Sequence, residues 1–256
     1  MRMARTLSVA AVVATVGLAG AGCSSGGSSS SSSASTTITV GAASSLTDVF
    51  ATISDSFTKA NPGISVKFSF AASSAIAEQI TQGAPLDVFA SAGATSMQPL
   101  VDGGQVTGAT DFAKNSLQIA TPPGNPAGVT VLADLAKVKV VVCEDQVPCG
   151  VAAQKLFDAN SLTITPVSLE PDVRSVLAKI EADEADAGIV YVTDVRAAGG
   201  MVVGVTIPAD QNVTSTYQAG VVAASAQADA AAKFVAYLAS PEAQAILAAA
   251  GFAPAS

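Results

Sequence analysis

The 256-residue chain contains no histidine and no tryptophan, only three cysteines, and few aromatic residues, 5% in all. Without histidine it lacks the most common general base, the most common metal ligand and the side chain that titrates near neutral pH. We therefore expect no enzymatic activity, no cofactor and no direct metal ligands. Half of the chain is hydrophobic, which is enough for one large core or two smaller ones.

Basic residues are also scarce. The chain has 12 lysines and arginines against 20 acidic residues; without Arg2 and Arg5, which precede Cys23, ten remain and the net charge is near −10. This charge disfavours nucleic acid as a partner. It does not exclude an anionic ligand, because backbone N–H groups, hydroxyl groups and helix N-termini can bind anions without a basic side chain.

Residues 1–22 are typical of a signal peptide: two positive charges, an apolar run over 7–18 and small residues before Cys23. The run is short for a membrane span. Cys23 resembles the acylated cysteine of bacterial lipoproteins, although Gly20 stands where their motif most often has leucine. Residues 23–37, rich in serine and glycine, predict a flexible tether. We expect a lipid-anchored protein on the extracytoplasmic face of the cell membrane.

Cys143 and Cys149 are the other two cysteines, six positions apart. In an exported chain this pair predicts a disulfide, worth roughly 2 kcal/mol in the chain-entropy model. The alternative is two reduced, buried thiols. A metal pair is disfavoured because the spacing is not C-x-x-C and no third ligand is evident.

Short apolar runs alternate with helical patterns from residue 38 onward, which predicts an α/β protein with parallel strands. Strands are expected at 38–42, 64–70, 86–90, 117–120, 138–142, 164–167 and 188–192. Helices are expected at 46–57, 73–82 and 173–180, where apolar residues recur with helical spacing. Acidic residues at 181–186 follow no calcium-loop spacing and are interpreted as a solvated helix end. Length alone leaves open one domain or two.

Two of the expected strand-to-helix turns are built alike, at residues 42–46 and 70–75. Each has small residues and a serine, Ser45 or Ser73, at the start of the helix. Such turns at the carboxyl ends of parallel strands can bind an anion through a hydroxyl group and free N–H groups. The alternative is that both serines are ordinary helix caps.

Six short motifs follow one another in a set order: AASSL at 42–46, FAASS at 70–74, GAPLDVF at 83–89, VPCG at 147–150, DVR at 172–174 and GIVY at 188–191. Together they resemble the periplasmic molybdate-binding proteins, over residues 38–252. The resemblance implies a two-lobed, hinged periplasmic-binding-protein-like fold, each lobe a mostly parallel sheet flanked by helices. The first lobe would comprise 38–116 and 221–256, and the second 117–220.

The resemblance also implies the contacts to the oxyanion, none of them charged. The first lobe would contribute the hydroxyl and backbone N–H groups of Ser45 and Ser73. The second would contribute the backbone N–H groups of Cys149 and Val173 and the hydroxyl group of Tyr191. Family members commonly have alanine in place of Cys149, a change that a backbone contact tolerates. Arg174 is adjacent, but on a helix its side chain projects about 100° away from that of Val173.

By this resemblance, the protein captures molybdate, and tungstate as well, and delivers it to the membrane permease of an ABC importer. We expect a monomer. One alternative is a binding protein for another oxyanion, such as sulfate, since size is the main difference between sulfate and molybdate. Another is a hydrolase with Ser45 or Ser73 as nucleophile, but neither lies in G-x-S-x-G and no histidine could activate it.

Replacing Cys23 with alanine tests the expected anchor. The variant should be released from membranes by detergent-free washing, because the acylated side chain is missing, while the parent is retained. Immunoblotting of membrane and soluble fractions measures this. Equal membrane retention of the two proteins would contradict acylation at Cys23.

Overall fold

The computed structural model of the protein describes residues 35–255. The predicted signal peptide, Cys23 and residues 24–34 of the tether lie outside this range. The last two residues of the predicted tether, Thr36 and Thr37, are already paired in a strand, with Ile64 and Ser65. Within the described range, no helix is both long and apolar enough to cross a membrane.

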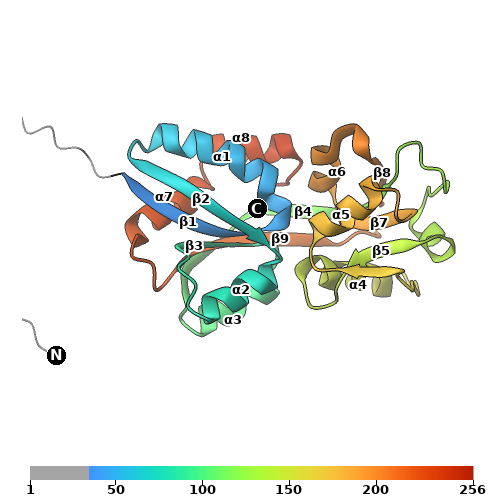
Figure 1. The fold of residues 1–256 in the computed structure, drawn as a ribbon, viewed down its shortest axis with the longest axis horizontal. Coiled ribbons are helices and arrows are strands. Elements are labelled where there is room, and N and C mark those ends of the chain that lie inside the picture. Colours follow the sequence, from blue (N-terminus) through green and yellow to red (C-terminus); the bar gives the residue numbers. More distant parts are fainter. Residues whose placement is uncertain (1–34, 256) are drawn as a thin grey trace, which may run out of the picture. The chain divides into compact units, whose positions relative to one another are not determined.

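A mixed sheet runs through the described residues in the order β2-β1-β3-β9-β4-β7-β5-β6, with β8 paired to β4 (Figure 1). The strands are β1 (Thr36–Ala43), β2 (Ile64–Ala71), β3 (Val88–Ser91), β4 (Val106–Thr121), β5 (Val140–Cys143), β6 (Ser168–Glu170), β7 (Ala187–Tyr191), β8 (Val203–Thr206) and β9 (Thr214–Val222). The α-helices are α1 (Thr47–Ala60), α2 (Ser73–Thr81), α3 (Ala94–Asp102), α4 (Pro148–Ala159), α5 (Val173–Glu181), α6 (Val192–Ala198), α7 (Ala228–Tyr237) and α8 (Pro241–Ala250). Short 3-10 helices are η1 (Ser44–Leu46), η2 (Leu132–Lys137) and η3 (Gly199–Met201).

The predicted α/β class is confirmed, and the strand pairing is more mixed than expected. β1 pairs in parallel with β2 and β3, and β5 with β6 and β7, whereas β4 and β9 in the middle pair antiparallel. The strand predicted at 164–167 is wrong, since β6 begins at Ser168. Pro166 lies within the predicted run and has no N–H group to donate to a neighbouring strand.

The helical pattern after β1 is confirmed in detail. Its apolar residues are all buried: Leu46, Val49, Phe50, Ile53 and Phe57. Phe50 and Phe57 pack edge-on against Phe234 of α7, with ring centroids 5.9 and 5.2 Å apart. This packing fixes α1 on the sheet and thereby places η1 at the end of β1.

The described residues have separate hydrophobic cores in two halves, which lie side by side in Figure 1. β4 joins them, because it pairs with β9 up to Ser116 and with β7 from Leu117 onward. The chain returns with β9, whose first residue, Thr214, already pairs with Ser116. A boundary at 220/221, as expected from the sequence, would cut through β9. We therefore call 35–116 with 214–255 the first half, and 117–213 the second half.

Candidate functional site

The five residues singled out from the sequence line one small cavity between the halves: Ser45, Ser73, Cys149, Val173 and Tyr191. The first two come from the first half and the other three from the second. Ser44 and Asp172 also line this cavity. The structure therefore brings together residues that are up to 146 positions apart, because the carboxyl ends of their strands meet here.

Most of these residues stand at the start of a helix. Ser45 is the second residue of η1, Ser73 opens α2, Cys149 is the second residue of α4, and Val173 opens α5. N–H groups in the first turn of a helix have no acceptor within that helix. Together with the helix dipoles they favour a negative charge in the cavity without a basic side chain.

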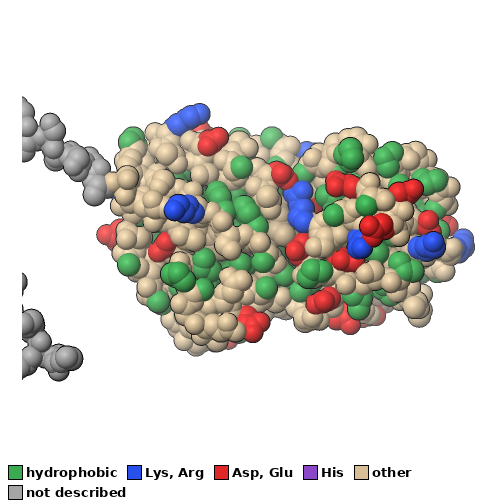
Figure 2. All heavy atoms as spheres, in the orientation of Figure 1, with side chains coloured by type: hydrophobic (Ala, Val, Ile, Leu, Met, Phe, Trp, Pro, Cys, Tyr) green, Lys and Arg blue, Asp and Glu red, His purple; other side chains and the backbone are tan. Residues whose placement is uncertain are grey.

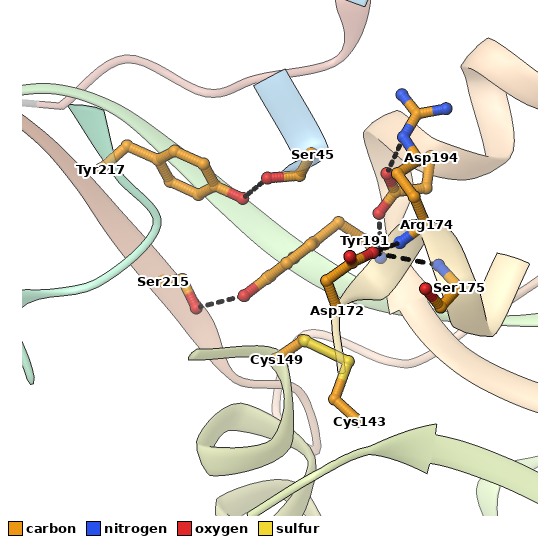
Figure 3. The surroundings of a disulfide bond; sticks show 10 residues. All are labelled: Ser45, Cys143, Cys149, Asp172, Arg174, Ser175, Tyr191, Asp194, Ser215 and Tyr217. Carbon is orange, nitrogen blue, oxygen red and sulfur yellow. Dashed lines mark hydrogen bonds and ion pairs between the residues drawn. A yellow bond between two sulfur atoms is a disulfide. The ribbon is translucent and has the colours of Figure 1, made fainter. Parts of the chain in front are cut away.

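Both serine hydroxyl groups have an internal hydrogen-bond partner. Ser45 Oγ lies 2.8 Å from Tyr217 Oη of β9, as Figure 3 shows. Ser73 Oγ accepts a hydrogen bond of 3.0 Å from the backbone N–H of Ala92. Neither partner is a base that could remove the hydroxyl proton, so the arrangement suits a hydrogen-bond donor better than a nucleophile. Neither serine acts through its side chain as a helix cap, so that alternative is wrong.

Tyr191 ends β7 and is almost completely buried. Its hydroxyl group points past the disulfide region toward Ser215, with an Oη–Oγ distance of 3.4 Å (Figure 3). Burial raises the pKa of Tyr191 to about 12, so the hydroxyl group keeps its proton near neutral pH. It therefore stays a neutral hydroxyl group that can donate a hydrogen bond in the cavity.

The turn that carries Cys149 is held in two ways. A disulfide links Cys149 to Cys143 at the end of β5, with a Cα–Cα distance of 5.7 Å (Figure 3). Gly150 packs so closely against the preceding loop that a Cβ atom there would lie 1.9 Å from the carbonyl oxygen of Glu144. Both features fix the first turn of α4, whose residue Cys149 lines the cavity.

Arg174 lies beside the cavity without lining it. Its guanidinium group extends away from the hydroxyl groups of Ser45 and Tyr191 (Figure 3). It forms ion pairs with Asp48 of α1 and with Asp194 of α6, the latter with 3.3 Å between Nε and Oδ1. The positive charge of Arg174 is thus engaged by two carboxylates, one in each half.

Asp194 is fully buried and accepts a hydrogen bond of 3.0 Å from the Tyr191 N–H group. Burial raises the pKa of its carboxyl group to about 7, while the neighbouring Arg174 acts in the opposite direction. Removing Arg174 alone would leave this carboxyl group buried without its counter-charge.

Asp172 is the one carboxylate that lines the cavity. Its Oδ1 atom accepts hydrogen bonds from the backbone N–H groups of Arg174 and Ser175, at 2.8 and 3.0 Å. It therefore caps α5 and leaves the N–H group of Val173 outside that cap. Some repulsion of an anion by this carboxylate remains, which the helix starts must outweigh.

Chemically, the cavity offers hydroxyl and N–H donors in a setting where no donor is a cation. On the face shown in Figure 2, acidic side chains are scattered and the few basic ones form no patch. In the described residues, no group of three or more His, Cys, Asp or Glu side chains could hold a metal ion. The arrangement suits a small, fully ionised oxyanion.

Sequence reasoning missed several residues of the site. Tyr217 and Asn115 lie on β9 and on the first part of β4, strands that were not predicted. Asn115 Nδ2 donates to Thr193 Oγ1 at 2.8 Å and to Tyr217 Oη at 3.5 Å. No local motif connects Tyr217 or Asn115 with Ser45. Only a prediction that β9 pairs with β4 could have indicated that these side chains lie near the site.

The chain matches a known protein family along most of its length. A family model described as bacterial extracellular solute-binding protein matches residues 38–253. The molybdate-binding protein ModA of Mycobacterium tuberculosis (strain ATCC 25618 / H37Rv) is 40% identical over 219 residues, 84% of each chain. The chain belongs to the bacterial extracellular solute-binding protein family.

Two solved structures show the same fold. The periplasmic molybdate-binding protein of Azotobacter vinelandii has a TM-score of 0.75 and 22% identity, covering 84% of this chain and 98% of that one. The sulfate-binding protein SubI of M. tuberculosis H37Rv has a TM-score of 0.76 and 22% identity, covering 86% and 87%. The fold thus occurs in proteins named for two different oxyanions.

The disulfide yields a direct prediction. Mass spectrometry of the unreduced, alkylated protein should detect the Cys143 and Cys149 peptides linked together. Replacing Cys143 with alanine should lower the free energy of unfolding by about 2 kcal/mol, because the loop is then no longer closed in the unfolded chain. Full alkylation of both cysteines without reductant would contradict the prediction.

Proposed function

We propose that this protein binds molybdate, and tungstate in much the same way, in the cavity between its halves. The hydroxyl groups of Ser45, Ser73 and Tyr191 and the N–H groups of Cys149 and Val173 would donate to the oxyanion. The observation that carries the proposal is the convergence of these five neutral donors on one cavity. The name of the ModA relative, 40% identical along most of the chain, supports molybdate as the ligand.

The donors favour an oxyanion that carries no proton. Molybdate, tungstate and sulfate are unprotonated dianions near neutral pH, whereas phosphate retains a proton and needs an acceptor. Sulfate is the second candidate, because the fold also matches a sulfate-binding protein. Donor chemistry does not separate sulfate from molybdate, so their difference in size would have to do so.

We infer that the two halves are lobes that close on the ligand. The cavity takes donors from both halves, while β4 and the segment entering β9 connect them. The ion pair between Arg174 and Asp48 also joins α5 to α1 across the two halves. A hinge in the connecting segments would let the ligand enter and would then exclude water from it.

The proposed setting is the extracytoplasmic face of the cell membrane. Residues 1–22 would direct export, and a lipid on Cys23 would anchor a monomer beside the permease of an ABC importer. The disulfide between Cys143 and Cys149 fits an oxidising compartment outside the cytoplasm. A serine hydrolase is the weaker alternative, because the partners of Ser45 and Ser73 are a tyrosine hydroxyl and a backbone N–H group.

Calorimetric titration of the ligand-stripped protein tests the ligand and the donors together. The parent should bind molybdate and tungstate more tightly than sulfate and much more tightly than phosphate. Ser45→Ala, Ser73→Ala and Tyr191→Phe should each weaken molybdate binding by roughly one to two decades, since a hydrogen bond to a charged group is worth about 1.5–3 kcal/mol. Affinities must be measured well below the melting transition.

The matched control is the double variant Arg174→Ala with Asp194→Asn. It removes the neighbouring positive charge without leaving a buried carboxylate unpaired. It should weaken molybdate binding much less than the three hydroxyl variants do, because it deletes an ion pair between the halves and no donor to the ligand. If the double variant loses binding while the three hydroxyl variants retain it, the site is centred on arginine and the proposal is wrong. If sulfate binds more tightly than molybdate in the parent, the protein is a sulfate-binding protein.

A further inference from the structure

Tyr217 lies directly behind Ser45, outside the set of residues expected to touch the anion. It is completely buried, and its ring packs edge-on against Phe112, Tyr191 and Phe252 at centroid distances of 6.2, 6.0 and 5.3 Å. This packing fixes the ring and so fixes the position of its hydroxyl group. Figure 3 shows that hydroxyl group directed at Ser45.

The direction of the hydrogen bond between the two hydroxyl groups follows from their partners. The Tyr217 hydroxyl group lies 2.8 Å from Ser45 Oγ and 3.5 Å from Asn115 Nδ2. An amide nitrogen only donates, so of these two partners only Ser45 Oγ can accept the Tyr217 proton, and we infer that it does. Burial raises the pKa of Tyr217 well above its ordinary value, which keeps that proton in place.

The consequence falls on the Ser45 proton. Because Ser45 Oγ accepts from Tyr217, its own hydrogen is left for the cavity, and among the described residues Ser45 Oγ has no other partner. Ser73 is held in a similar way, since its Oγ atom accepts a hydrogen bond from the Ala92 N–H group. The partner of Ser73 is a backbone N–H group, which a conservative substitution cannot remove. Tyr217 is therefore the side chain whose substitution can change whether a serine in the cavity donates or accepts.

Building on the oxyanion-binding function proposed above, we propose that Tyr217 is a positioning residue that selects for unprotonated oxyanions by holding Ser45 as a donor. Molybdate offers only acceptor oxygens and matches this donor. Hydrogen phosphate also carries a P–OH group, which needs an acceptor. Ser45 held as a donor does not provide one, and the Asp172 carboxylate in the cavity is engaged as the cap of α5. Removing the Tyr217 hydroxyl group frees Ser45 Oγ to accept from such a ligand.

The test compares Tyr217→Phe with the parent by titration with molybdate and with phosphate at mildly alkaline pH, where hydrogen phosphate predominates. Phenylalanine keeps the ring packing and deletes only the hydroxyl group. Molybdate affinity should fall about tenfold, while phosphate affinity should stay the same or rise, so that the ratio of the two affinities falls at least tenfold. A purely structural defect would instead weaken both anions alike.

Tyr237→Phe is the matched control. Tyr237 also donates to a serine, Ser56 Oγ at 2.8 Å, but neither residue lines the cavity. This variant should leave the affinity ratio unchanged within about twofold. In the Ser45→Ala background, Tyr217→Phe should likewise change molybdate affinity by less than about twofold, because Tyr217 acts through Ser45.

Three results would overturn the proposal. An unchanged ratio in Tyr217→Phe, with the parent binding molybdate, overturns the role of Tyr217 and leaves the proposed function standing. A loss that simply adds to that of Ser45→Ala shows that Tyr217 does not act through Ser45. A parent that binds no oxyanion at all overturns both this proposal and the proposed function.

Discussion

N–H groups at the start of a helix have no acceptor within that helix, and burying them without a partner costs free energy. Here η1, α2, α4 and α5 begin around one small cavity, so this unmet demand is concentrated at a single place. The surrounding features serve to hold those starts in position. α1 is anchored by its phenylalanines, the α4 turn by the disulfide and Gly150, and α5 by the Asp172 cap.

These N–H groups without acceptors also explain how an acidic protein can hold an anion. A basic side chain in the cavity would attract anions of many kinds, whereas fixed neutral donors reward only an anion of the right shape and protonation state. Arg174, the nearest guanidinium group, is kept out of this role by Asp48 and Asp194. Its ion pairs join the two halves, and both carboxylates already balance its charge.

Local patterns in the sequence predicted the parallel strands other than β6. They also predicted the helices α1, α2 and α5, but not α3, α4 or α6. The serine turns at Ser45 and Ser73 could be found in this way, because strand, turn and helix start are consecutive in the chain. The contacts of Cys149, Val173 and Tyr191 could not, since only the resemblance to a family connected those positions. All five residues line the cavity, although their contact with a ligand remains a prediction.

Long-range antiparallel pairing is what local patterns did not reveal. β9 pairs with β3 and β4 over large sequence separations, and it brings Tyr217 within 2.8 Å of a serine 172 residues away. The partners of Arg174 were missed because they come from other elements, α1 and α6, that only the folded chain brings close to it. Helix geometry predicted that the Arg174 side chain projects away from that of Val173, and Arg174 does not line the cavity. It gave no indication of which residues Arg174 contacts.

A crystal structure of the protein soaked with molybdate, with molybdenum located by its anomalous scattering, tests the central claim most directly. We expect the ion in the cavity, with its oxygens within hydrogen-bonding distance of the Ser45, Ser73 and Tyr191 hydroxyl groups and of the Cys149 and Val173 N–H groups. Arg174 should still pair with Asp48 and Asp194. An ion held by the Arg174 guanidinium group, or bound elsewhere, would contradict a pocket of neutral donors.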